Sequence, residues 1–162
     1  MQRLSSSSTG FYKRVFPVLW FGFIVLFFAF SLWARLQPGS ADDRPPDLIF
    51  LAMPLMMAAI GFVVFRRLIF DLMDEVWLDG DWLVVTNRGE KRRVPLADVM
   101  NINATTTTNP RRITVMLRSA GPLGSEFNFM PASPRGLFNL FKPDPVATAL
   151  IRRVDAARQA AR

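Results

Sequence analysis

The chain has 162 residues, of which 51% are apolar, and it carries a formal net charge of +7. It contains no Cys and no His. These absences exclude a disulfide framework, a thiolate nucleophile, a Cys-ligated metal, a Ser-His-Asp triad and an imidazole base. The length is compatible with one domain, but the apolar residues gather in the first part of the chain.

The first apolar run covers residues 15–34 and contains no charged residue. At about 1.5 Å per residue, a helix over this run spans roughly 30 Å, the thickness of the hydrocarbon core of a bilayer. Trp20 and Trp33 lie near its ends, where indole rings favour the headgroup level. The apolar core of a signal peptide is shorter, about 7–15 residues, so we expect a membrane helix over about residues 15–35.

A second apolar run covers residues 48–65 and is followed by two arginines. Pro54 lies inside it, and membrane helices tolerate such a residue at the cost of a kink. We expect a second membrane helix over about residues 48–68. Together the two helices would form a transmembrane hairpin over residues 15–70.

The positive charges near the two runs predict the topology, because Lys and Arg gather on the cytoplasmic side of a membrane. The cations at the two ends of the hairpin are Arg3, Lys13, Arg14, Arg66 and Arg67, whereas the connecting loop has Arg35 and Arg44. Both termini should therefore be cytoplasmic. Residues 1–14 include a run of serines and are expected to be disordered.

From about residue 71 the sequence changes to short runs of β-branched and aromatic residues between turn signals. Asp79-Gly80 and Asn87-Arg88-Gly89 are typical of hairpin turns. The strands we expect cover residues 75–78, 82–86, 91–96, 99–106, 112–118 and 126–130. Such a series is typical of a small antiparallel sheet or barrel.

Alternation of residue types predicts which face of these strands is buried. We expect the following side chains to face the core: Met100, Ile102, Ala104, Ile113, Val115, Leu117, Phe127 and Phe129.

A C-terminal helix is expected over about residues 144–160, with Asp144 as its cap and Pro145 at its first position. Its apolar stripe consists of Ala147, Leu150, Ile151, Val154 and Ala157. The predicted fold class is thus an α+β membrane protein. A two-helix transmembrane hairpin precedes an antiparallel β-sandwich or open barrel over residues 71–162, capped by the C-terminal helix.

Three runs, 81–87, 92–99 and 112–118, have a recognisable pattern, of which the Pro-Leu-x-Asp-Val element at 95–99 is the most distinctive. After two apolar helices and before a terminal helix, they resemble the strands of bacterial membrane proteins with a pleckstrin-homology-like domain. The resemblance covers about residues 46–162. It implies a two-pass protein of the bacterial inner (plasma) membrane.

That fold has seven strands, so the resemblance implies one more strand than the six predicted, near residues 68–73 or 137–141. Family members that bind phosphoinositides have a basic first hairpin loop, whereas the loop at residues 78–81 is acidic here. The resemblance therefore implies a scaffold without that lipid site.

A basic cluster is the first candidate contact site. It consists of Arg88, Lys91, Arg92, Arg93, Arg111 and Arg112. Near a membrane, each cation gains about 1 kcal/mol from anionic lipid. The alternative is that these charges protect a sheet edge against strand pairing.

An apolar segment between two cations is the second candidate. Its large residues are Leu137, Phe138, Leu140 and Phe141. Such a segment can enter the membrane interface. The alternative is that it packs under the C-terminal helix.

We expect no catalytic, cofactor-binding or metal-ligating residue, since no phosphate loop or nucleotide motif occurs. The predicted function is a non-enzymatic binding or scaffold module for a membrane or cytoplasmic protein, or for its own copies. Exposed strands and a helix–sheet groove are its expected contact surfaces. The alternatives are a module facing anionic lipid in the bilayer, or an accessory subunit of a membrane enzyme or transporter complex. The modest positive excess after residue 71 argues against nucleic acid as a partner.

Overall fold

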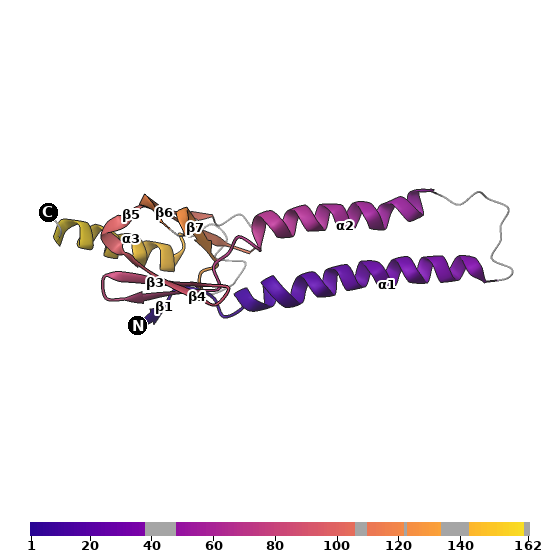
Figure 1. The fold of residues 1–162 in the computed structure, drawn as a ribbon, viewed down its shortest axis with the longest axis horizontal. Coiled ribbons are helices and arrows are strands. Elements are labelled where there is room, and N and C mark those ends of the chain that lie inside the picture. The colour runs from indigo at the N-terminus through magenta and orange to yellow at the C-terminus, as the bar shows by residue number, and fades with distance from the viewer. Residues whose placement is uncertain (38–47, 106–109, 122, 134–142, 161–162) are drawn as a thin grey trace. The chain divides into compact units, whose positions relative to one another are not determined.

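The computed structural model describes residues 1–37, 48–105, 110–121, 123–133 and 143–160 (Figure 1). The chain divides into two compact units. The helical unit is Phe11–Phe70, and the β-unit combines Met1–Gly10 with Asp71–Arg162.

The helical unit consists of a π-helical turn, Phe11–Val15, and two helices, α1 (Phe16–Leu36) and α2 (Leu48–Leu68). Their bounds lie close to the predicted ones. The two helices run antiparallel (Figure 1).

Contacts between the helices gather where α1 begins and α2 ends. The ring centroid of Phe65 lies 5.6 Å from that of Phe16 and 6.4 Å from that of Trp20. Gly61 permits this approach, because a Cβ at that position would lie 2.6 Å from Trp20 Nε1.

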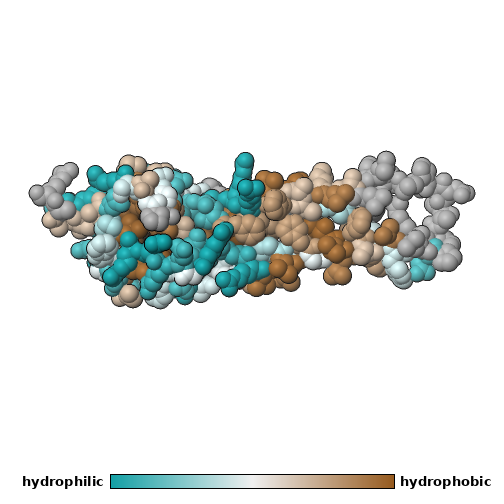
Figure 2. Space-filling model, viewed as in Figure 1, coloured by the Kyte–Doolittle hydropathy of each residue, from teal (hydrophilic) through white to brown (hydrophobic). Residues whose placement is uncertain are grey.

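Most large apolar side chains of the helical unit are exposed, and brown side chains gather over the helices in Figure 2. In the part of the chain that the structure describes, one helical stretch, Phe11–Ala34, is long and apolar enough to cross a membrane, with a mean hydropathy of 2.4. Helix α2 is present at the predicted place, but its crossing of a membrane stays a prediction.

The first sheet of the β-unit has four antiparallel strands in the order β1-β2-β3-β4. The strands are β1 (Gln2–Arg3), β2 (Glu75–Asp79), β3 (Trp82–Asn87) and β4 (Glu90–Pro95). Two-residue turns join β2 to β3 and β3 to β4, as the turn signals predicted.

The second sheet has three antiparallel strands in the order β5-β6-β7. The strands are β5 (Val99–Thr105), β6 (Arg112–Gly121) and β7 (Gly124–Phe129), and a short 3₁₀ helix, η2 (Leu96–Asp98), precedes β5. All six predicted strands are present. The prediction that Met100 faces the core is wrong, because the register shifts between Val99 and Asn101 and leaves Met100 exposed.

Helix α3 (Pro145–Ala160) contributes Ala147, Leu150 and Val154 to a core that also contains residues of both sheets. Asp144 caps the helix, since its Oδ1 accepts a hydrogen bond from the N–H of Val146 at 2.9 Å. The chain is thus α+β, with antiparallel sheets and a C-terminal helix, as predicted. Ile151 belongs to the predicted apolar stripe but is 41% exposed.

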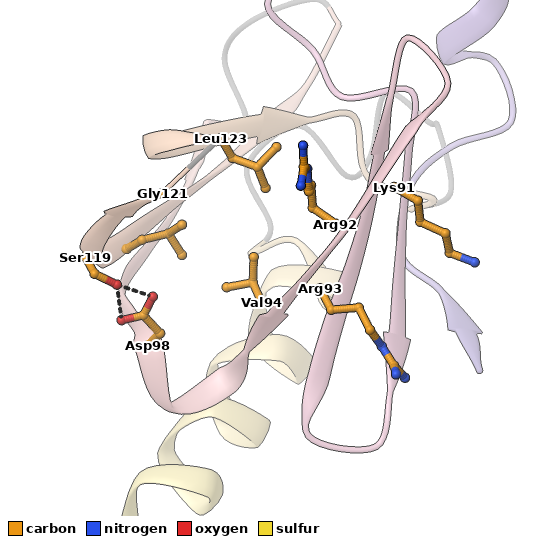
Figure 3. A pocket seen from close by; sticks show the side chains of 9 residues that line it. Lys91, Arg92, Arg93, Val94, Asp98, Ser119, Gly121 and Leu123 are labelled. Atoms are coloured by element: carbon orange, nitrogen blue, oxygen red, sulfur yellow. Dashed lines mark hydrogen bonds between the residues drawn. The ribbon is translucent and has the colours of Figure 1, made fainter.

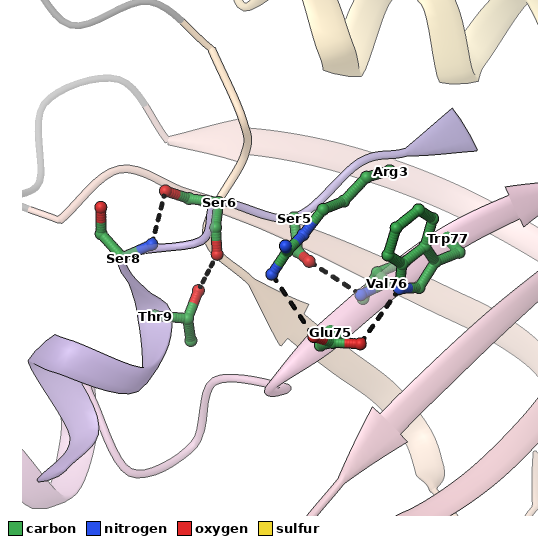
Figure 4. Close-up of polar contacts among 8 residues, drawn as sticks. All are labelled: Arg3, Ser5, Ser6, Ser8, Thr9, Glu75, Val76 and Trp77. Carbon is green, nitrogen blue, oxygen red and sulfur yellow. Dashed lines mark hydrogen bonds and ion pairs between the residues drawn. The ribbon is translucent and has the colours of Figure 1, made fainter. Parts of the chain in front are cut away.

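The first residues of the chain are part of the β-unit. Leu4 is 3% exposed within the core. The N–H groups of Leu4 and Ser5 donate to the carbonyl of Val76, and the N–H of Val76 donates to Ser5 Oγ at 2.9 Å (Figure 4). The prediction of a disordered N-terminus is wrong for residues 1–10, because their polar groups complete the edge of β2.

The same segment also reaches the stretch that follows β7. The N–H of Ser6 donates to the carbonyl of Met130 at 2.8 Å, and the N–H of Ala132 donates to the carbonyl of Leu4 at 2.8 Å. Strand β1 is thus the seventh strand of the β-unit, whereas the resemblance implied one near residues 68–73 or 137–141. At the first of those places Leu72 forms an isolated bridge with Asn128 outside the named strands, and residues 137–141 lie outside the described residues.

Candidate functional site

A groove of about 450 Å³ borders strand β4, at the edge of the four-stranded sheet (Figure 3). Three consecutive predicted site residues, Lys91, Arg92 and Arg93, line it and are exposed. The other lining residues are Val94, Asp98, Leu117, Ser119, Gly121 and Leu123.

Side chains alternate along β4, so Arg92 and Val94 lie on one face and Lys91 and Arg93 on the other. Val94 belongs to the buried core. Arg92 lies on the same face of the strand, just beyond the edge of that core. In Figure 3, Arg92 and Val94 lie toward Leu123, whereas Lys91 and Arg93 point away.

Among the residues that the structure describes, no strand pairs with the side of β4 that faces away from β3. The N–H of Leu96 donates to the carbonyl of Asp81 at 2.8 Å. This bond identifies which residue pairs of the β3–β4 ladder are hydrogen-bonded and which are not. Hydrogen-bonded and non-hydrogen-bonded pairs alternate in an antiparallel ladder. The register therefore directs the main-chain N–H and C=O of Lys91 and Arg93 away from β3.

The opposite wall of the groove comes mainly from the end of β6. Its pairing with β7 is irregular between Met116 and Gly121. The hydroxyl of Ser119 donates to the carboxylate of Asp98, 2.8 and 2.9 Å from its two oxygens, and so links this wall to η2. Leu117 and Leu123 also lie on this side, so the groove has a basic wall and a mixed one, in which leucines flank the Asp98–Ser119 pair.

Two cations of β4 form ion pairs at the surface, one with the half-buried Asp79 and one with the exposed Glu90. Arg93 lies 2.8 Å from Asp79, and Arg92 lies 3.1 Å from Glu90. For Lys91, the described residues show no ion pair. Exposed pairs contribute about 0–1 kcal/mol each, so these side chains can exchange partners at little cost.

Arg88 lies outside the lining of the groove. It occupies the β3–β4 turn with a φ of 51°, followed by Gly89 at 88°. Its N–H donates to Asp74 Oδ2 at 2.6 Å, which ties the turn to the segment before β2. The Arg88 side chain itself is exposed.

Arg112 belongs to a polar chain at the start of the β-unit. Its Nη2 lies 3.1 Å from Asp71 Oδ2, an oxygen that also accepts from the amide of Asn128. Thr114 in turn donates to Asn128 Oδ1 at 2.6 Å. Arg112 thus links β6 to the segment before β2, and neither it nor Arg111 lines the groove.

A second, smaller groove of about 120 Å³ lies between β5 and α3. Arg158 crosses it and donates to the carbonyls of Val99 and Met100, at 2.5 and 2.6 Å. These contacts already use two carbonyls at this edge of β5. The groove beside β4 is therefore the better candidate for binding a partner.

Sequence analysis identified the basic wall but missed the other one. Nothing in the pattern places Ser119 opposite Asp98, because the two are 21 positions apart. The apolar candidates Leu137, Phe138, Leu140 and Phe141 lie outside the described residues. Among the residues that the structure describes, no three acidic, His or Cys side chains gather as metal ligands.

No protein-family model, curated protein or solved structure matches this chain.

Proposed function

We propose that the protein is a two-pass membrane protein whose β-unit is a non-enzymatic binding module. It would hold a partner protein at the cytoplasmic face of the bacterial inner membrane. The observation that carries this proposal is the groove beside β4. It borders an edge of the sheet with which no strand of the described residues pairs. The resemblance of about residues 46–162 to bacterial membrane proteins with a pleckstrin-homology-like domain adds support, because it implies a scaffold for binding.

The pairing of β1 with β2 supports the two-pass topology. These strands belong to one unit, and the whole helical unit lies between them in the sequence. A chain that crossed a membrane once between them would leave them on opposite sides, where they could not pair. If Phe11–Ala34 crosses the membrane, α2 must therefore bring the chain back.

Site-specific crosslinking in native membranes tests the binding role. A photoactivatable amino acid would replace Arg92 in the groove or, as a matched control, the exposed Arg152 on α3. We expect one protein to crosslink at near-stoichiometric yield from position 92 and not from position 152. Crosslinks to lipid alone from position 92 would favour the module that faces anionic lipid. Equal crosslinking to protein from both positions would contradict the proposal.

Single cysteines test the topology, because the chain has no Cys of its own. We expect an impermeant maleimide to label Gln37→Cys in intact cells, since this position follows α1. Ser7→Cys and Gln159→Cys should react only after permeabilisation. Labelling of Ser7→Cys and Gln159→Cys from opposite sides would contradict the two-pass topology.

A further inference from the structure

We propose that the groove beside β4 binds an acidic, extended segment of the partner, which joins the sheet as a fifth strand on β4. This inference rests on the proposed function and specifies the chemistry of the partner.

The backbone geometry of β4 suits such an addition. The outward N–H and C=O groups of Lys91 and Arg93 are two residues apart, the repeat at which an antiparallel neighbour forms its hydrogen bonds. A strand laid along this edge finds both donors and acceptors.

The positive charge of β4 favours an acidic strand as its neighbour. Lys91, Arg92 and Arg93 place cations on both faces of the edge. Opposite charges on neighbouring strands attract, whereas like charges directly opposite one another repel. A second copy of β4 would place cations against cations, so self-pairing is disfavoured and an acidic strand is favoured.

The two walls predict the pattern of the bound segment. Side chains that enter the groove meet Arg92, the apolar Leu117 and Leu123, and the Asp98 carboxylate, which accepts from Ser119. The bound segment should therefore place an acidic residue at Arg92 and apolar or neutral ones toward Asp98. Side chains on the other face meet Lys91 and Arg93 and should be acidic. A lipid headgroup could pair with the cations and donate to one outward carbonyl, but it lacks the alternating donors and acceptors that match both Lys91 and Arg93. The geometry therefore favours a strand.

Peptide binding tests the inference on the full-length protein in phosphatidylcholine nanodiscs. The probe is a fluorescent synthetic peptide that alternates glutamate and valine, and its binding is measured by anisotropy. A peptide with glutamine in place of glutamate should bind about tenfold more weakly, because the cross-strand charge pairs are lost. Salt should weaken binding of the glutamate peptide.

Two further comparisons isolate the backbone contacts. A glutamate–valine peptide with alternate backbone nitrogens methylated should lose binding, although its charge is unchanged. In the protein, Lys91→Pro should weaken binding more than Lys91→Ala, because proline also removes the N–H that would bond the added strand. That N–H points away from β3, so an edge strand tolerates proline at this position. Arg152→Ala is the matched control and should leave binding unchanged.

Equal binding of the glutamate and glutamine peptides, or insensitivity to methylation, would overturn strand addition. Displacement of the peptide by nanodiscs that contain phosphatidylglycerol would overturn it in favour of a headgroup site. If position 92 crosslinks to a protein but no acidic peptide binds, strand addition fails and the proposed function stands. If position 92 crosslinks to no protein, the proposed function fails, whatever the peptide does.

Discussion

The two units of this protein use the same apolar residue types in opposite ways. In the β-unit, Phe127 is 1% exposed, whereas Phe23 in the helical unit is 65% exposed. Water drives apolar side chains into a core, but lipid chains are as apolar as the side chains themselves and provide no such force. This contrast is the one that the proposed membrane location of the helices predicts.

Matched phenylalanine substitutions give the strongest test of this contrast. Phe127→Ala should destabilise the β-unit by about 3–5 kcal/mol, because it leaves a cavity in the core. Phe23→Ala should leave the β-unit unchanged. Urea unfolding of the full-length protein in detergent, followed by limited proteolysis, measures both. A similar loss for the two variants would contradict the contrast.

The boundary between the units can be tested at the first residues of the chain. Leu4→Ala should destabilise the β-unit by about 2–5 kcal/mol, because Leu4 belongs to its core. Gln2→Ala is the control, since Gln2 is exposed. The same unfolding experiment measures the difference. An unchanged unfolding midpoint for Leu4→Ala would show that the N-terminal strand contributes nothing to the unit.

Packing within the helical unit depends on close approach at one glycine. Gly61→Leu should destabilise the helix pair by about 1–3 kcal/mol, because the new side chain meets the indole of Trp20. Gly22→Leu should be tolerated, since no atom lies within 4 Å of a Cβ there. The readout is the yield of bis-maleimide crosslinks between Phe21→Cys and Phe65→Cys. Equal yields for both glycine variants would contradict this packing.

The smallest expected effect concerns the cap of α3. Asp144→Ala should destabilise the β-unit by about 1 kcal/mol, because the N–H groups of Val146 and Ala147 lose their acceptor. Asp144→Asn keeps an acceptor oxygen and should lose less. Thermal unfolding followed by circular dichroism compares the two. If both variants lose the same amount, the cap contributes nothing measurable.

Local signals predicted most of the β-unit. Turns at Gly80 and Gly89, together with alternation at Ile113, Val115 and Leu117, were enough to predict β2, β3, β4 and β6. Local signals fail where a contact is distant or a register slips. The bulge after Val99 exposes Met100, although alternation places this residue in the core.

Strand β1 and the groove illustrate the same limit. Strand β1 has two residues, too few to show the alternation that predicts a strand. Ser5 completes the edge of β2 through its hydroxyl, a contact that the sequence pattern does not reveal. The three cations of β4 were predicted as a site. The opposite wall of the groove depends on the irregular pairing of β6 with β7, which the sequence does not reveal. Only the fold brings such a wall opposite β4.

The pairing of Ser5 with Val76 also has a consequence for biosynthesis, since 71 positions separate the two residues. The N-terminal strand leaves the ribosome before the helices, and its partners on β2 and after β7 follow only later. Contacts between such distant positions form slowly. In the proposed two-pass topology, the N-terminal segment would stay unpaired until both helices had inserted. A nascent chain whose second helix failed to return would leave Leu4 without its core and remain open to quality-control proteases. Completion of the β-unit would thus act as a proofreading step for membrane insertion.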